Sequence, residues 1–183
     1  TRSLKHRATA EWIVGLPADR GEDRAETLAH HLESAMSYGR AAGNDVSDLA
    51  PLLARALRDA GDRAFALNIV SRAAQYYRRA IEAGESNAAD PELLARYLET
   101  RMWAEGVEGG AKGFEETIDA LLSAGRGDLA ALSLIWLERT RWNAGQPEPV
   151  LLDRALELVA DAGPTLIRGR VIGFVATRWA IGG

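Results

Sequence analysis

Apolar residues recur at helical spacing along most of this chain. In residues 69–81 they return every three or four positions, while the positions between them are charged or polar. This spacing places the apolar side chains on one face of a helix. The stripe consists of Ile69, Val70, Ala73, Tyr77, Ala80 and Ile81. No segment alternates with period two for long enough to predict a strand, so the pattern favours an all-α protein.

Glycine and proline divide this periodic sequence into segments. Glycine follows most of the segments, as it does at helix C-termini, and proline falls in the gaps or at first helical turns. Short connections of this kind favour antiparallel packing of consecutive helices. We predict nine helices, at residues 3–15, 23–43, 48–67, 69–84, 91–106, 111–124, 128–144, 148–162 and 165–181.

The helix predicted at 128–144 differs from the others, because its apolar residues cover most of its circumference. A helix of this kind has to be covered by neighbours on several sides. We therefore expect it to be covered on several sides, as in the middle of an α-solenoid.

A tryptophan followed three residues later by glycine ends four segments of the chain. The last three copies are 39 and 37 residues apart, and Thr-Arg precedes each of them. The four copies are Trp12-Gly15, Trp103-Gly106, Trp142-Gly145 and Trp179-Gly182. A recurrence at this interval in helical sequence is typical of stacked helical repeats, which serve mainly as binding surfaces.

Residues 54–84 resemble a tetratricopeptide repeat. The likeness lies in Ala73-x3-Tyr77-x2-Ala80 on the second helix, with Leu57 and Gly61 at the large and small positions of the first. The small position is needed because the two helices of such a hairpin approach closely. Ala64 departs from the motif, which prefers an aromatic residue there. Looser matches follow at Phe114/Ile118/Leu121 and Glu148/Leu152/Ala155.

The resemblance implies a tetratricopeptide-like α-α superhelix of about nine antiparallel helices. We expect residues 1–183 to form a single helical-repeat domain that is a fragment of a larger protein. Residues 1–45 would form an N-terminal junction hairpin, and residues 46–183 would form degenerate repeats.

A narrower likeness runs through the first 85 residues. The segments LAHH at 28–31 and AGDRA-x-AL at 60–67 resemble the helical region that follows the ATPase module in large actinobacterial regulators. Those regulators are of the adenylate/guanylate-cyclase-linked and LuxR-type kinds. The resemblance implies that this segment transmits or receives a signal, while catalysis belongs to other domains.

Composition narrows the function further. The chain has 183 residues, a net charge of −4 and no cysteine, so disulfides and thiolate chemistry are excluded. Its charge gives no general attraction to nucleic acid or to anionic membranes. No apolar run reaches the length of a membrane span, and no signal-peptide pattern is present at the N-terminus. We expect a cytoplasmic protein.

Two clusters are candidate chemical sites. His30 and His31 lie near Glu26 and Glu33, but adjacent histidines point about 100° apart on a helix, so we expect packing rather than a metal site. The glycine-rich residues 106–113 lack the Lys-Ser/Thr step and the preceding strand of a phosphate-binding loop. We predict no catalytic residue, metal or cofactor, and no enzymatic activity.

The tryptophan–arginine pairs are the candidate binding residues. If they line one face, they form a ladder for an extended peptide or for an acidic, aromatic-compatible ligand. Alternatively, each tryptophan wedges between successive hairpins while arginine satisfies helix-terminal carbonyls. The residues concerned are Trp103, Trp142, Trp179, Arg101, Arg141 and Arg178.

We expect a non-catalytic protein-interaction or regulatory helical-repeat domain of a signalling or transcription regulator. The alternative is a small-molecule-sensing domain with a pocket lined by tryptophan and arginine. The expected partner is a protein or another domain of the same polypeptide, without direct nucleic-acid or membrane binding.

The last predicted helix adds an expectation about self-association. No predicted helix follows to cover its apolar residues, and each large side chain left in water forfeits about 1.5–3 kcal/mol of burial. We therefore expect either a homodimer through this helix or another segment of the parent protein that covers it. The residues expected to be exposed are Val171, Ile172, Phe174, Val175 and Trp179.

Overall fold

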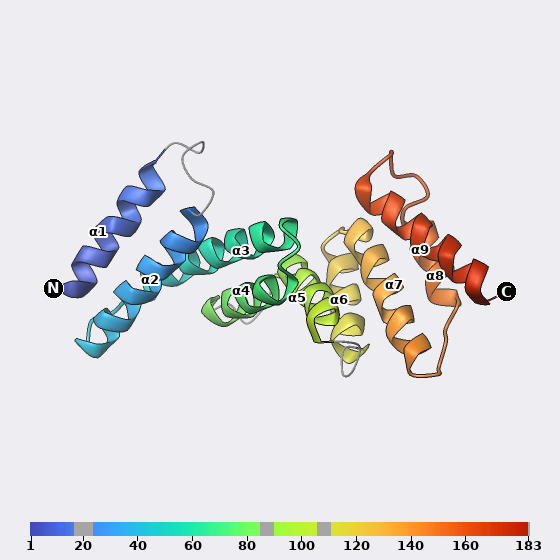
Figure 1. Cartoon of the computed structure of the whole chain (residues 1–183), viewed down its shortest axis with the longest axis horizontal. Helices are drawn as coiled ribbons and strands as arrows, with labels where there is room; N and C mark the ends of the chain where they lie inside the picture. Colours follow the sequence, from blue (N-terminus) through green and yellow to red (C-terminus); the bar gives the residue numbers. More distant parts are fainter. Residues whose placement is uncertain (17–23, 85–89, 106–110, 183) are drawn as a thin grey trace. The chain divides into compact units, whose positions relative to one another are not determined.

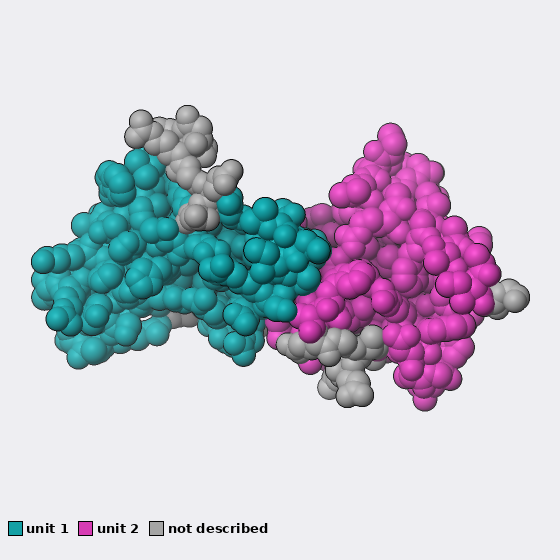
Figure 2. All heavy atoms as spheres, viewed as in Figure 1, with its two compact units in different colours: residues 1–93 teal, residues 94–183 magenta. Residues whose placement is uncertain are grey.

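The computed structural model describes residues 1–16, 24–84, 90–105 and 111–182. These ranges are all α-helical and contain nine α-helices and one short 3₁₀ turn, without a strand (Figure 1). Within them, no helix is both long and apolar enough to cross a bilayer. The predicted fold class is confirmed. The chain divides into two compact units, residues 1–93 and 94–183, and each is described by itself (Figure 2).

Unit 1 is built from consecutive helices that pack in chain order. Helix α1 packs on α2, α2 on α3, and α3 on α4. Their bounds are α1 (Arg2–Gly15), α2 (Arg24–Ala41), α3 (Ala50–Ala66) and α4 (Val70–Ala83), with the 3₁₀ turn Ser47–Leu49 leading into α3. Proline occupies the first turn of α3, where its missing N–H leaves no hydrogen bond unmade.

The α3–α4 hairpin has the close approach that the sequence pattern predicts. A Cβ atom at Gly61 would lie 2.6 Å from Cε1 of Tyr77, so no larger residue fits there without displacing the ring. The Tyr77 hydroxyl donates a hydrogen bond of 2.7 Å to Asp62. Ile69, in contrast, was predicted on the buried stripe, but it precedes α4 and is exposed.

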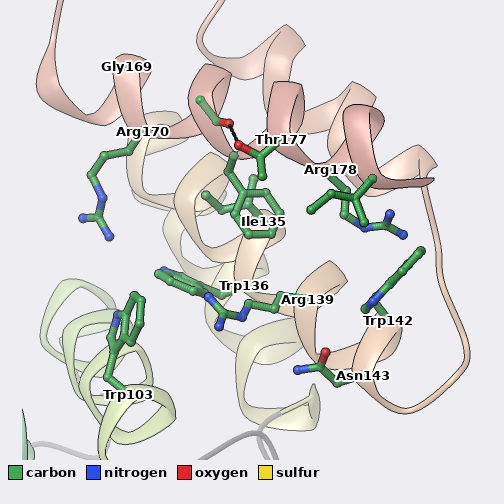
Figure 3. Close-up of a pocket in the computed structure, with 13 residues that line it drawn as sticks. Trp103, Ile135, Trp136, Arg139, Trp142, Asn143, Gly169, Arg170, Thr177 and Arg178 are labelled. Carbon is green, nitrogen blue, oxygen red and sulfur yellow. Dashed lines mark hydrogen bonds between the residues drawn. The ribbon is translucent and has the colours of Figure 1, made fainter. Parts of the chain in front are cut away.

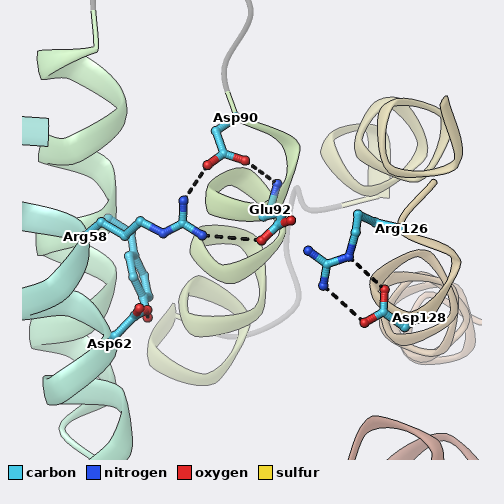
Figure 4. A network of polar contacts seen from close by, with 7 residues as sticks. Arg58, Asp62, Asp90, Glu92, Arg126 and Asp128 are labelled. Carbon is cyan, nitrogen blue, oxygen red and sulfur yellow. Dashed lines mark hydrogen bonds and ion pairs between the residues drawn. The ribbon is translucent and has the colours of Figure 1, made fainter. Parts of the chain in front are cut away.

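Helix α5 (Pro91–Glu105) begins with a polar cap. The Asp90 carboxylate accepts a hydrogen bond of 2.9 Å from the backbone N–H of Glu92, as an N-cap residue does. Arg58 of α3 donates to both carboxylates, at 2.5 Å to Asp90 and 3.4 Å to Glu92 (Figure 4). These contacts attach the start of α5 to α3 within unit 1.

Unit 2 is arranged around α7. This helix packs against α6, α8 and α9, and its apolar residues share one core with the buried residues of α5. Residues 130–138 are all buried, which confirms that α7 is covered on several sides. The helices of this unit after α5 are α6 (Ala111–Ser123), α7 (Gly127–Asn143), α8 (Val150–Leu158) and α9 (Leu166–Gly182).

The nine predicted helices are all present in the described ranges, and their ends differ from the predictions by a few residues at most. The largest difference is at α8, which ends at Leu158 instead of residue 162 because the chain then turns with hydrogen bonds of the i→i+3 type. Gly125 and Gly145 follow α6 and α7 with φ of 71° and 73°, which confirms them as left-handed C-terminal residues. Most of the glycine-rich stretch 106–113 lies outside the described residues.

The exposure predicted for α9 is corrected in part. Val171 and Val175, one turn apart, are buried in the unit 2 core because this edge of the helix faces its neighbours. Phe174 is partly buried against the same core, whereas Ile172 and Trp179 are exposed as predicted. A large part of the apolar surface of α9 is therefore already covered within the unit.

Candidate ligand-binding pocket

A hollow of about 580 Å³ opens in unit 2 between α5, α7 and α9 (Figure 3). Its size lies within the range of typical small-molecule sites, about 300–1,000 Å³. The described residues that line it are Trp103 of α5; Ile135, Trp136, Arg139, Trp142 and Asn143 of α7; and Gly169, Arg170, Gly173, Phe174, Thr177, Arg178 and Ile181 of α9.

Helical periodicity brings these residues to one place. On α7 the lining positions are 135/136, 139 and 142/143, and on α9 they are 169/170, 173/174, 177/178 and 181. Residues three and four apart share a helix face, so each helix presents one continuous stripe to the hollow. All the described lining residues therefore belong to helices.

Aromatic rings form one end of the pocket. The indoles of Trp103 and Trp136 meet edge to face, with centroids 5.4 Å apart and planes inclined by 81°. Phe174 also contacts Trp136, at 6.2 Å between centroids. Trp136 is only 4% exposed, so it belongs to the core and to the pocket wall at once.

Arg139 lies against two of these rings. Its Cζ atom is 5.2 Å from the ring centroid of Trp103 and 5.5 Å from that of Trp136, which is within cation–π range. Figure 3 places its side chain between Trp136 and Asn143 at the centre of the pocket. Among the described residues, none forms a hydrogen bond or an ion pair with this guanidinium. Its N–H donors are thus left for another group.

The other two arginines of the pocket are neutralised by buried carboxylates. Arg170 forms an ion pair with Glu99, and Arg178 forms one of 3.3 Å with Glu138, which is completely buried. The Arg178 guanidinium also stacks on the ring of Trp142. No aspartate or glutamate is found among the described lining residues. The balance of the pocket is one uncompensated positive charge, on Arg139.

A buried donor without a partner also belongs to this pocket. The Nε1 atom of Trp136 is inaccessible to water and makes no hydrogen bond to any described residue. Buried polar groups in folded proteins nearly always have a partner, so this atom is an exception. The indole N–H is shielded behind the pocket wall, and a group in the pocket does not reach it in this arrangement.

Two glycines of α9 keep the hollow open. A Cβ atom added at Gly169 or Gly173 would meet no atom within 4 Å. Glycine inside a helix is less stable than alanine by roughly 0.5–1 kcal/mol, so α9 is weakened at both positions. The absence of a side chain at these two positions leaves free space in the wall of the pocket.

The structure brings together half of the predicted binding residues. Trp103, Trp142 and Arg178 line the pocket, whereas Trp179 is 57% exposed outside it. Arg141 also lies outside, where it pairs with Glu115 and Glu148. Arg101 on α5 is likewise not among the lining residues.

Sequence reasoning missed Trp136, Arg139 and Arg170. Trp136 was interpreted only as a core residue, and the two arginines belong to no Trp-x-x-Gly copy. One local pattern could have indicated two of them, because Trp136, Arg139 and Trp142 recur every three residues on one helix.

The three histidines of the chain form a separate cluster in unit 1. Nδ1 of His6 on α1 lies 2.9 Å from Nδ1 of His31 on α2, and His30 contacts both rings. Burial lowers the pKa of His31, and the neighbouring His6 and His30 lower this pKa further. Within the described ranges, no three histidine, aspartate or glutamate side chains are arranged to hold a metal ion.

No model of a known protein family matches this chain, and no curated protein sequence is significantly similar to it. The resemblances to tetratricopeptide repeats and to ATPase-linked regulators therefore stay predictions.

Proposed function

We propose that this chain is a non-catalytic regulatory domain of helical repeats and that its second unit binds a small molecule. The observation that carries the proposal is the hollow of about 580 Å³, walled by tryptophan and phenylalanine rings and carrying three arginines. Apolar walls with a few convergent polar groups are typical of ligand sites. The resemblance of the first 85 residues to bacterial regulators supports a signalling role in the cytoplasm.

The lining chemistry favours binding over catalysis. Among the described lining residues there is no histidine, carboxylate or serine that could act as a base or nucleophile. Thr177 carries the single hydroxyl among them, and this hydroxyl donates a hydrogen bond of 2.8 Å to the carbonyl oxygen of Gly173. The pocket is suited to holding a molecule rather than changing it.

A substitution that fills the pocket tests this proposal. Gly173→Leu places a side chain into open space in the wall, so it should remove binding without disturbing the core. Ala176→Leu is the matched control, because it adds a similar side chain at an exposed position of α9 outside the pocket.

The measurement is thermal unfolding of the whole chain with a panel of organic acids, amines and neutral aromatic compounds. A ligand that binds the folded state raises the unfolding midpoint. We expect at least one compound to stabilise the wild type and Ala176→Leu, but not Gly173→Leu. Equal stabilisation of Gly173→Leu would place the binding outside the pocket and contradict the proposal.

Protein interaction is the second candidate function. It is favoured by exposed tryptophans outside the pocket, Trp12 on α1 at 65% and Trp179 on α9 at 57% exposure. Tryptophan is enriched among the residues that contribute most to protein–protein binding. Replacing Trp12 and Trp179 with glutamine should weaken the affinity for a protein partner and leave small-molecule binding unchanged.

A further inference from the structure

We infer that the ligand of this pocket is a small organic monoanion whose carboxylate binds Arg139 and whose flat apolar body lies among the aromatic rings. This inference rests on the proposed function and adds the chemical class of the ligand.

The charge balance of the pocket indicates the sign and the number of the charges on the ligand. Arg170 and Arg178 are paired with Glu99 and Glu138, while Arg139 has no anionic partner among the described residues. A ligand with one negative charge would therefore balance the charge of the site. A cationic ligand would add to the uncompensated charge, and a ligand with several negative charges would exceed it.

The position of Arg139 favours a carboxylate. The guanidinium lies within cation–π distance of Trp103 and Trp136, while its N–H donors have no partner among the described residues. Those donors match the two oxygens of a carboxylate in a paired geometry that lysine does not offer. The two indoles also hold the group in place before the ligand arrives, which reduces the entropy lost on binding.

The remaining wall determines the body of the ligand. Ile135, Phe174 and Ile181 are apolar, and the two glycines of α9 leave open space beside them. Flat apolar groups suit walls made of indole rings, which favour offset or edge-to-face contacts. An acidic peptide fits less well, because its additional carboxylates would lie near Glu99 and Glu138 with no free arginine to bind them.

Three probes with one ring system separate these possibilities. They are 1-naphthylacetate, its neutral amide and 1-naphthylmethylamine, each titrated into the whole chain by isothermal calorimetry. An amidated peptide rich in glutamate is the fourth probe. We expect the carboxylate to bind roughly tenfold or more tightly than the amide, and the amine and peptide to bind no better than the amide.

Variants of Arg139 assign the preference to this residue. Arg139→Gln should reduce the affinity for the carboxylate roughly tenfold or more and leave that for the amide nearly unchanged, which also verifies that the pocket is intact. Arg139→Lys should recover only part of the loss, because lysine keeps the charge without the paired geometry. The control Arg154→Gln removes an exposed charge of α8 outside the pocket and should have no effect.

The outcomes distinguish the inference from the function on which it rests. Equal affinity for carboxylate and amide, or a preference for the amine or the peptide, would overturn the carboxylate assignment. In that case a probe would still bind, and loss of its binding in Gly173→Leu would show that the pocket is a ligand site. If none of the four probes bound, the inference about the ligand would be overturned. The pocket would be overturned as a ligand site only if no compound of the panel stabilised the chain in a way that depends on Gly173.

Discussion

Glu138 is a completely buried carboxylate that depends on a single partner, Arg178. Removing the partner leaves an uncompensated charge in the core, so Arg178→Met should destabilise the chain by about 3–5 kcal/mol. Urea unfolding measures the change. The double variant Arg178→Met/Glu138→Gln should recover most of the loss, because no buried charge then remains. Equal stability of the single and double variants would show that the ion pair is not the cause.

The glycines give a second prediction at the residue scale, in which one substitution has opposite effects at two positions. Gly61→Ala should destabilise by about 1–3 kcal/mol, because its Cβ would collide with the ring of Tyr77. Gly173→Ala meets open space and should stabilise by about 0.5–1 kcal/mol through helix propensity. Thermal unfolding of both variants checks the contrast, and a loss of stability in Gly173→Ala would contradict the free space described at the pocket.

At the scale of elements, the α1–α2 pair contains a pH-dependent contact. The pKa of His31 is lowered by burial and by the neighbouring histidines. The unfolded chain therefore takes up a proton at a higher pH than the folded chain, near the ordinary value of about 6.5. The contribution of His31 to the free energy of unfolding is therefore fully present above that pH, and it is lost as the pH falls below it.

Two protonated rings would also place a donor on both Nδ1 atoms, which are 2.9 Å apart. Among the described residues, the ring and cation contacts of this cluster are made by His30, by Tyr38 stacked on His6, and by Arg2 over the Tyr38 ring. None of these three carries a negative charge. We expect the temperature of the unfolding midpoint to decrease as the pH is lowered from about 7.5 to about 5.5. In His31→Gln the dependence of this temperature on pH should be weaker. An unchanged slope in the variant would assign the pH dependence to other groups.

The elements themselves could be predicted from the sequence because their determinants are local. Apolar spacing and the glycines and prolines between segments define each helix without reference to its neighbours, and Gly61 opposite Tyr77 is a pattern within one hairpin. The pocket depends instead on the rotation of α5, α7 and α9 about their own axes, which is decided by packing between them. For this reason Trp179 and Trp142 look equivalent in sequence, yet only Trp142 lines the pocket.

For the molecule as a whole, self-association through α9 stays a prediction. Val171 and Val175 are buried within unit 2, so the remaining apolar surface there is smaller. It is formed mainly by Leu166, Ile172, Trp179 and Ile181. We expect the sedimentation coefficient to rise with concentration, and Trp179→Glu to suppress this rise because a charge in an apolar interface is costly. A single monomeric species at all concentrations would contradict the dimer.

Three of the five tryptophans of this chain line the pocket, and two of them meet edge to face at 5.4 Å. At this separation the electronic transitions of Trp103 and Trp136 couple. The circular dichroism of the pair should therefore differ from the sum of two independent indoles. Replacing either tryptophan should change the spectrum by more than the signal of one isolated indole, because the coupled signal of the pair is lost as well. Any occupant that reorients one ring would alter this optical coupling, so the protein carries an intrinsic, label-free reporter at the place where we expect it to bind.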